Sequence, residues 1–416
     1  NVSQLEMALR MDGLGDAFIL RTNQSKGKLN YYDEAKNEYK EALKLRQDTV
    51  GNDTDKSLSQ SYLRLGIINY LQNNYDEANK DLEKALKIRE TTGRPLQIAE
   101  VKRALSKVLL AQHKKDEAIK ERLKELATGK GFSPSSLNTY KNCPLQFYYE
   151  KILNIKEPAV MEETIEAKTL GSVVHRALED FYRPYLNRKI NTEDLKSMLA
   201  KIPAKLKELF LEEFKSGIFK KGKNKLIYTV AEEFLHSFIK KEIILISEGN
   251  EIYIKGLEKE LKTEICIEEI DFAVKLNGNA DRVDKLNGQL RIIDYKTGKV
   301  ELGELQTNDM EKLIRDKKFH KGFQLYLYAY MYQQMYPEQE LLETGVVSFR
   351  SLKKGFLPAG FVEEGKVNKL LNHNLLGDFE KEFKNLLKEI FNPNIPFEHK
   401  KRKEPCRFCD PEAFRS

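Results

Sequence analysis

The interpretation of the fold starts from RIIDYKTGKV, residues 291–300. Ile292 and Ile293 favour a β-strand, because β-branched side chains pack well on a pleated sheet. A strand that served packing alone would not place the Asp294 carboxylate and the Lys296 ammonium two residues apart at its end. We therefore treat Asp294 and Lys296 as candidates for a chemical role.

A tight hairpin is predicted just before this stretch. Asn287-Gly288 is the strongest short signal for a two-residue type I′ turn. In the register that this turn sets, Asp281 lies directly opposite Asp294, with Cβ atoms about 4.5–5.5 Å apart. Lys296 shares the face of Asp294, because side chains alternate along a strand.

Two carboxylates in direct opposition destabilise a sheet unless their charge is neutralised. Mg²⁺ or Mn²⁺ would neutralise them, because hard cations prefer oxygen ligands. Lys296 could then stabilise negative charge on a phosphate, so the pattern predicts a hydrolytic site for phosphodiesters. The residues alone leave an alternative open, in which both aspartates are solvated residues near a turn.

Composition limits the classes of protein. The chain has 416 residues, 40% apolar and 32% charged, which predicts about two or three domains with real cores. No apolar run long enough for a transmembrane helix is present. The net charge of +7 fits a polyanionic partner without requiring one. Four cysteines make no disulfide framework, so a cytoplasmic location is expected.

Nucleotide-driven enzymes are not expected. GKG at 129–131 lacks the upstream glycine and the Ser or Thr of a phosphate-binding loop, and no other such motif occurs. The sequence therefore argues against a helicase or ATPase in this chain.

Residues 1–130 read as helix after helix. Segment 31–45 can be laid over segment 74–88, and 114–127 is a weaker third copy. The pattern resembles the tetratricopeptide repeat family, whose stacked helix pairs bind peptides on a concave surface. The matching small and large packing positions are Leu65, Gly66, Ala35, Tyr39, Ala42, Ala78, Leu82 and Ala85.

The glycines and the proline of 127–134 predict a domain boundary, followed by a second domain over 131–416. Its pattern predicts helices up to about residue 247 and then a sheet with further helices. The predicted strands are 252–276, 279–285, 290–296 and 346–352, and the later helices are 320–336 and 377–391.

The A-x-x-D and D-Y-K-T-G-K motifs resemble the PD-(D/E)XK nuclease superfamily, in the branch found at the end of the RecB and AddB nucleases. The resemblance implies that Asp281 and Asp294 bind Mg²⁺ or Mn²⁺ and that Lys296 is catalytic. The backbone carbonyl of Tyr295 would be a further ligand. Ala280 stands where the superfamily's name has Pro, a variation that this branch allows.

Three more stretches match that branch in the right order: 133–153, 170–182 and 324–332. The second implies that His175 approaches the metal and that Gly171 lets its helix pack closely. In the third, Gln324 and Tyr328 lie one turn apart on a helix face, where they would position DNA or brace the lysine.

Glu258 is a candidate additional acidic residue of the site, and the sequence favours Glu260 equally.

The cysteines raise a separate question. Many members of this branch hold a [4Fe–4S] cluster, and Cys143, Cys406 and Cys409 match three of its four ligands. The expected fourth position is Arg415. A cluster usually needs thiolates for all its irons, so a three-cysteine remnant, another fourth ligand or a zinc site stays open. Cys266 is expected to be a buried small apolar residue.

The resemblance implies an N-terminal all-α helical repeat followed by an α/β restriction-endonuclease-like core, with a mixed sheet flanked by helices. The expected activity is that of a Mg²⁺-dependent deoxyribonuclease, an exonuclease or end-processing enzyme of DNA repair or recombination. DNA would bind without sequence preference, with the lysine runs at 215–225 and 400–403 as candidate phosphate contacts.

Protein partners, including a helicase subunit, would bind the repeats. The alternatives are an inactive DNA-binding scaffold and a fusion of two functionally unrelated halves.

Overall fold

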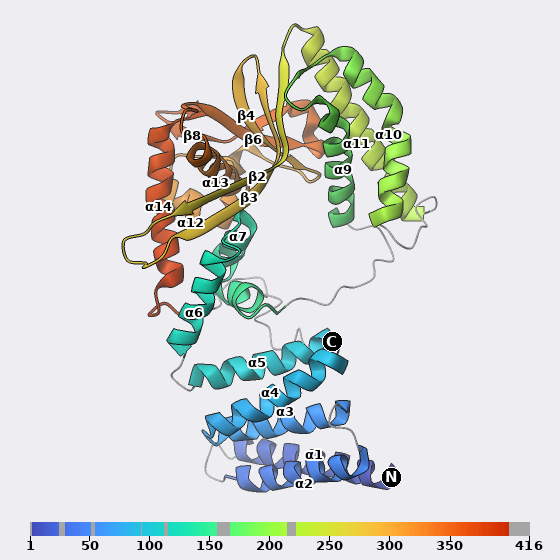
Figure 1. Ribbon diagram of the computed structural model, residues 1–416, viewed down its shortest axis with the longest axis vertical. Helices are drawn as coiled ribbons and strands as arrows, with labels where there is room; N and C mark the ends of the chain where they lie inside the picture. Colours follow the sequence, from blue (N-terminus) through green and yellow to red (C-terminus); the bar gives the residue numbers. More distant parts are fainter. Residues whose placement is uncertain are drawn as a thin grey trace. The chain divides into compact units, whose positions relative to one another are not determined.

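The computed structural model describes residues 2–24, 30–50, 55–92, 94–111, 115–155, 167–213 and 222–398. The chain forms two compact units (Figure 1). The repeat unit comprises Asn1–Arg122 and Tyr148–Ala159, and the nuclease-like unit comprises Leu123–Phe147 and Val160–Ser416. No helix among the described residues is both long and apolar enough to cross a membrane.

The repeat unit is a stack of antiparallel helices, as the sequence predicts. The first five helices form this stack, and each of the first four packs on the next one along the chain. Their bounds are α1 (Val2–Gln24), α2 (Tyr32–Val50), α3 (Lys56–Leu71), α4 (Tyr75–Thr92) and α5 (Pro95–Ala111). The next helix, α6 (Lys115–Thr128), crosses from the first unit into the second.

Glycines allow the helices of a pair to approach closely. A Cβ atom added at Gly66 in α3 would lie 2.5 Å from Leu82 Cγ in α4. Gly15 in α1 would clash in the same way with the ring of Tyr39 in α2. Leu14-Gly15 is thus the first copy of the Leu65-Gly66 pair, a repeat signal that the sequence analysis did not use.

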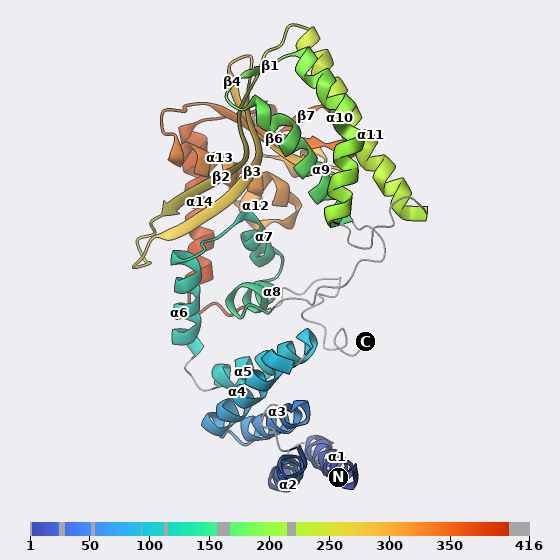
Figure 2. The same ribbon diagram turned by 45° about the vertical axis from the view of Figure 1, so that its right-hand side comes forward.

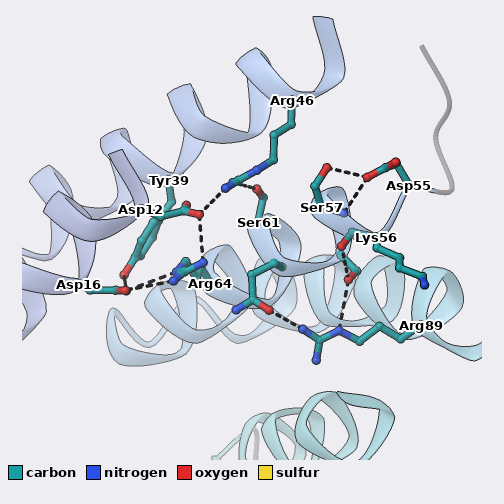
Figure 3. Close-up of polar contacts among 12 residues, drawn as sticks. Asp12, Asp16, Tyr39, Arg46, Asp55, Lys56, Ser57, Ser61, Arg64 and Arg89 are labelled. Atoms are coloured by element: carbon teal, nitrogen blue, oxygen red, sulfur yellow. Dashed lines mark hydrogen bonds and ion pairs between the residues drawn. The ribbon is translucent and has the colours of Figure 1, made fainter. Parts of the chain in front are cut away.

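Charged side chains are also buried between these helices (Figure 3). Arg46 donates to Asp12 Oδ2 and to Ser61 Oγ, each at 2.5 Å. Arg64 reaches Asp12 at 3.0 Å and Asp16 at 3.1 Å. Every carboxylate of this cluster therefore faces at least one guanidinium.

The nuclease-like unit is built on a seven-stranded mixed sheet in which β1-β2-β3-β4-β6-β10 lie in that order and β7 pairs with β6. Within this sheet, as far as the structure describes it, only β4 and β6 run parallel. The strands are β1 (Lys189–Ile190), β2 (Ile252–Ile265), β3 (Val274–Leu286), β4 (Gln289–Lys296), β6 (Leu342–Ser348), β7 (Phe356–Pro358) and β10 (Leu370–Leu371).

Helices cover both faces of this sheet (Figures 1 and 2). One layer contains α9 (Ala167–Tyr182), α10 (Thr192–Glu213) and α11 (Gly222–Ser247); the other contains α12 (Met310–Arg315), α13 (His320–Met335) and α14 (His373–Phe391). The core of the first layer includes Ile293 and Tyr295 of β4. Helix α13 contacts β2, β3, β4 and β6. The predicted restriction-endonuclease-like architecture is thus confirmed.

Smaller elements complete the unit. The short helices α7 (Pro134–Asn142) and α8 (Pro144–Phe147) open it, and a second sheet joins β5 (Gln306–Thr307), β8 (Gly360–Glu363) and β9 (Lys366–Asn368). Helix α7 begins at a capping box made by Ser133 and Ser136, with Pro134 at its first turn.

The structure corrects three local predictions. The strand predicted over 252–276 ends at Ile265, because the acidic segment that follows forms a loop before β3. Strand β6 ends at Ser348, where the chain tightens into a 3₁₀ turn that leads to Gly355 with a φ of 70°. Cys266 is exposed just beyond the end of β2, so its expected burial is wrong.

Candidate active site

The hairpin between β3 and β4 forms in the predicted register. Both turn residues have left-handed backbone, with φ of 50° at Asn287 and 86° at Gly288. Backbone pairing runs from the turn to Arg282 opposite Ile293. The next pair would be Asp281 and Asp294, but the antiparallel register ends one step before it.

The two aspartates are instead linked through a side chain. Asp281 Oδ2 accepts the backbone N–H of Tyr295 at 2.6 Å. Strand β4 continues through Asp294 and Lys296 in parallel pairing with β6. Because β3 no longer pairs with β4 here, the Asp281 carboxylate occupies the position of a strand partner. The predicted direct opposition of the two aspartates is therefore replaced by this contact.

Asp294 is buried, with 3% of its surface exposed, and it lies beside the predicted lysine. Lys296 Nζ is 2.8 Å from Asp294 Oδ2 and 3.1 Å from Oδ1. Gln324 of α13 donates to Asp294 Oδ1 at 3.0 Å and to the Tyr328 hydroxyl at 2.8 Å. Lys296 also donates to Gln324 Oε1 at 3.3 Å. Four predicted site residues thus share one hydrogen-bond network.

A second group of predicted residues forms a cluster suited to a cation. Ligand atoms of His175, Glu258 and Asp281 all lie within 4.8 Å of one another. His175 Nδ1 lies 3.3 Å from Asp281 Oδ1. Asp294 is outside this group among the described residues, and Tyr295 contributes its N–H to Asp281.

The structure distinguishes Glu258 from Glu260. Glu258 lies opposite Asp281, because its neighbours Leu257 and Lys259 pair with the residues on either side of Asp281. Its φ of 42° is unusual for a residue other than glycine. Glu260 is largely exposed and pairs with Lys262 at 2.6 Å. The sequence could not choose between them, since a loop without a recognisable tight turn joins β2 to β3.

Burial, together with an excess of negative charge, shifts the ionisation of the carboxyl groups. Burial raises the pKa of Glu258, and the charge of Asp281 adds to the effect, bringing the pKa to about 7. Burial likewise raises the pKa of Asp294, and Lys296 only partly offsets it. Groups whose pKa values are shifted by burial and by neighbouring charges are common at functional sites.

The pKa values of the basic groups are also raised, although burial acts on them in the opposite sense. Burial alone would lower the pKa of His175, but the Asp281 hydrogen bond and the nearby carboxylates outweigh it and raise that pKa. Burial would also lower the pKa of Lys296, and Asp294 and Asp281 raise it instead. Lys296 is therefore held in its charged form.

The donor set fits a divalent cation. One imidazole nitrogen and two carboxylate oxygens come from three separate elements, α9, β2 and β3. Carboxylate oxygens suit Mg²⁺ and Mn²⁺, and imidazole is a common ligand of transition metals. A cation here would neutralise the carboxylate charge that raises the pKa of His175 and that adds to the effect of burial on the pKa of Glu258.

A buried ionic network that the sequence analysis did not identify lies next to the site, between α11 and the strands β3 and β4. Arg282 is fully buried and pairs with Glu242 at 2.9 Å and Asp284 at 2.7 Å. Arg291 pairs with the same Asp284 at 2.9 Å. Arg282 also lies 3.5 Å from the hydroxyl of Tyr295, whose N–H holds Asp281. The network therefore fixes the β3–β4 register next to the cluster.

Other sequence-based expectations have mixed outcomes. Close packing at Gly171 is not observed, because an added Cβ would meet only Thr297 Oγ1 at 3.8 Å among the described atoms. Cys143 is buried at the end of α7. Cys406 and Cys409 lie outside the described residues, as do the lysine run at 400–403 and most of the run at 215–225.

Comparison with known families agrees with this geometry. A family model of the PD-(D/E)XK nuclease superfamily matches residues 131–413, and a tetratricopeptide repeat model matches residues 29–91.

Curated relatives cover part of the chain. A protein of Clostridium perfringens that is named as a subunit of an ATP-dependent helicase/deoxyribonuclease is 30% identical over 213 residues, 48% of this chain and 17% of the relative. A Carboxydothermus hydrogenoformans protein of the same name is 28% identical over 194 residues, 43% of this chain and 17% of the relative. The chain thus spans less than a fifth of the length of these relatives.

Proposed function

The chain belongs to the PD-(D/E)XK nuclease superfamily, and from that premise we propose that it is a metal-dependent deoxyribonuclease. It would hydrolyse phosphodiester bonds at the ends of DNA during repair or recombination, using Mg²⁺ or Mn²⁺. The observation that carries the proposal is the cluster of His175, Glu258 and Asp281 beside the buried Asp294–Lys296 pair.

The chain's own residues have separable tasks in this proposal. His175, Glu258 and Asp281 would hold the cation, which supplies Lewis acidity for attack of water on phosphorus. Lys296 carries a positive charge beside the cluster, where it would stabilise the negative charge that develops on the phosphate.

Gln324 and Asp294 orient this lysine through hydrogen bonds. Tyr328 fixes Gln324 in turn, and Tyr295 fixes Asp281.

The test is cleavage of end-labelled linear DNA, single- and double-stranded, with Mg²⁺, with Mn²⁺ or with a chelator. We expect cleavage that requires metal and is lost in Asp281→Asn. Asp378→Asn serves as the matched control, because Asp378 is exposed on α14. DNA binding without cleavage under all metal conditions would contradict the proposal and favour the scaffold alternative.

The repeat unit would bring this nuclease to a protein partner. Stacked helix pairs present a concave surface for peptides, and the curated relatives are named as subunits of a helicase/deoxyribonuclease. A helicase subunit is accordingly the proposed partner. Co-purification of ATP-dependent unwinding with the full chain, but not with a chain lacking residues 1–111, would support it. Equal recovery with both chains would contradict it.

A further inference from the structure

One side of helix α1 is apolar and exposed. Met7, Arg10, Leu14 and Ala17 follow one another at intervals of three and four residues, so they lie on one side of the helix, which we call the outer face. Met7 and Leu14 are each 52% exposed, and Arg10 and Ala17 are also exposed. The end helices of repeat stacks usually have a polar outer surface. Two large apolar side chains at this place therefore indicate a binding surface.

The equivalent positions of α3 show what covers such a face. The repeated Leu-Gly pairs place Leu14 and Ala17 of α1 at the positions of Leu65 and Ile68 in α3. Leu65 and Ile68 are only 4% and 0% exposed, because they belong to a cluster with the second helix of the preceding pair, α2. The outer face of α1 thus has the pattern that, in α3, receives a helix.

Helix α2 shows what such an occupant presents. Ala35 and Tyr39 belong to the cluster with α3, and Leu43 packs against it. Helix α4 repeats this spacing in the next cluster, with Ala78, Leu82 and Leu86. The expected occupant of α1 is therefore an amphipathic helix with an alanine, a tyrosine or leucine four residues later, and a leucine four residues after that.

One charged position distinguishes α1 from α3. Arg46 of α2 donates to Ser61 Oγ of α3 at 2.5 Å (Figure 3), and Arg89 of α4 donates to Glu100 of α5 at 2.9 Å. In both interfaces the second helix of one pair supplies the donor, and the next helix supplies the acceptor. Helix α1 instead has Arg10 at the position of Ser61, so it presents a donor. A helix that covers α1 therefore needs an acidic residue at the position of Arg46.

We propose that the outer face of α1 docks an amphipathic helix of a partner protein, which extends the stack beyond α1 and places an acidic residue opposite Arg10. The chain's own helices α2 and α4 have arginine at that position, so like charges would oppose docking of a second copy through them. This proposal rests on the docking role proposed for the repeat unit, but it places the partner at the end of the stack and not on the concave surface.

The test uses a fluorescent peptide with the sequence of residues 31–50 and the change Arg46→Glu, which combines the apolar spacing with the acidic residue. Fluorescence anisotropy follows its binding to the full chain. We expect saturable binding that Leu14→Glu weakens about tenfold, because a carboxylate replaces an apolar contact. The matched control is Leu226→Glu, at a leucine of α11 that is 64% exposed, and it should bind like the wild-type chain. If Leu14→Glu does not fold, Ala17→Glu replaces it with the same expectation.

A charge exchange tests the acidic position. The peptide that keeps Arg46 should bind the wild-type chain about fivefold more weakly than the Arg46→Glu peptide. In the Arg10→Glu chain this preference should reverse, which neither misfolding nor non-specific adhesion of the peptides would produce. Equal affinities of the two peptides for both chains would overturn the proposed pairing with Arg10.

Absence of saturable binding, or equal losses in Leu14→Glu and Leu226→Glu, would overturn the proposal. A dimer of the wild-type chain in sedimentation that Leu14→Glu dissociates would also overturn it, because the occupant would then be a second copy. Recovery of the helicase separates this proposal from the docking role itself. If recovery requires residues 1–111 but survives Leu14→Glu, this face fails alone. If the peptide binds α1 and no helicase is recovered, the proposed helicase partner fails and the face stands.

Discussion

Both units of this chain bury charged side chains, but they balance the charge differently. In the repeat unit, Asp12 contacts both Arg46 and Arg64, and Asp16 contacts Arg64 (Figure 3). Two acids are therefore matched by two arginines. The arginines of the fold itself thus neutralise the two carboxylates, and the cluster holds α1, α2 and α3 together.

The nuclease-like unit has no such balance at its described cluster. Three carboxylates lie here, Glu258 and Asp281 of the cluster and the neighbouring Asp294. They are accompanied by one lysine, Lys296, and by His175, whose pKa is raised by its hydrogen bond to Asp281 and by the charges of Asp281 and Asp294. Both units thus bury charge, but this cluster leaves an excess of negative charge, which an external cation would neutralise under the proposed function.

The largest expected effect is on catalysis. Asp294→Asn should lower the rate of cleavage by roughly 10³-fold, because it removes the partner that orients Lys296 and several kcal/mol of electrostatic stabilisation. Burial raises the pKa of Asp294, so removing its buried charge offsets the loss of the ion pair with Lys296. Urea unfolding should therefore show unchanged or higher stability. A large loss of stability would contradict the distinction between the two clusters.

Disrupting the repeat-unit cluster of Asp12, Asp16, Arg46 and Arg64 should lower stability and leave catalysis unchanged. Arg46→Met keeps the apolar stem but leaves Asp12 with Arg64 alone, so stability should fall by about 3 kcal/mol. Metal-dependent cleavage by the folded protein should persist. Urea denaturation followed by circular dichroism measures the loss, with Arg10→Met on the exposed face of α1 as control. Unchanged stability would mean that the cluster contributes little to the repeat unit.

Packing provides a smaller contrast between the units. Gly66→Ala should cost about 1–3 kcal/mol, because its methyl group would overlap Leu82. Gly171→Ala should be neutral or slightly stabilising, since its nearest described neighbour is Thr297 Oγ1 at 3.8 Å and alanine favours helices. Thermal unfolding of both variants measures the difference. If Gly171→Ala proves destabilising, the helix does pack closely at Gly171, as the sequence predicted.

The smallest effect concerns pH. The pKa of Glu258 is raised to about 7, so its ionisation in the metal-free folded state is unfavourable. The penalty is absent below the unfolded pKa of about 4.5 and fully present above about 7. Glu258→Gln should therefore stabilise the chelated protein at pH 8, by about 1 kcal/mol after allowing for solvent screening, and have no effect at pH 4. Equal effects at both pH values would rule out this ionisation.

Local sequence signals predicted the elements of both units because each depends on nearby residues. The turn signal at Asn287-Gly288 predicted the β3–β4 register correctly as far as Arg282 opposite Ile293. Ala78, Leu82 and Ala85 are fully buried, as their repeat positions predicted. Arg46 and Arg89 follow equivalent segments of two repeats and are both buried, a signal that was present in the sequence but overlooked.

Long-range placement was harder to predict. Glu258 joins His175 and Asp281 only because β2 pairs with β3 in one register, which no tight turn specifies. Strand β4 pairs with β6, more than forty residues later, at the level where its pairing with β3 has ended. The pairing of Arg282 with Glu242 likewise joins a helix and a strand that are distant in the sequence.

The most direct test of the charge imbalance is anomalous diffraction from crystals of the full chain soaked in Mn²⁺. We predict a manganese peak within coordination distance of His175, Glu258 and Asp281, and none beside Asp12 or Asp16. A peak at the repeat cluster, or none at the three predicted ligands, would contradict the account.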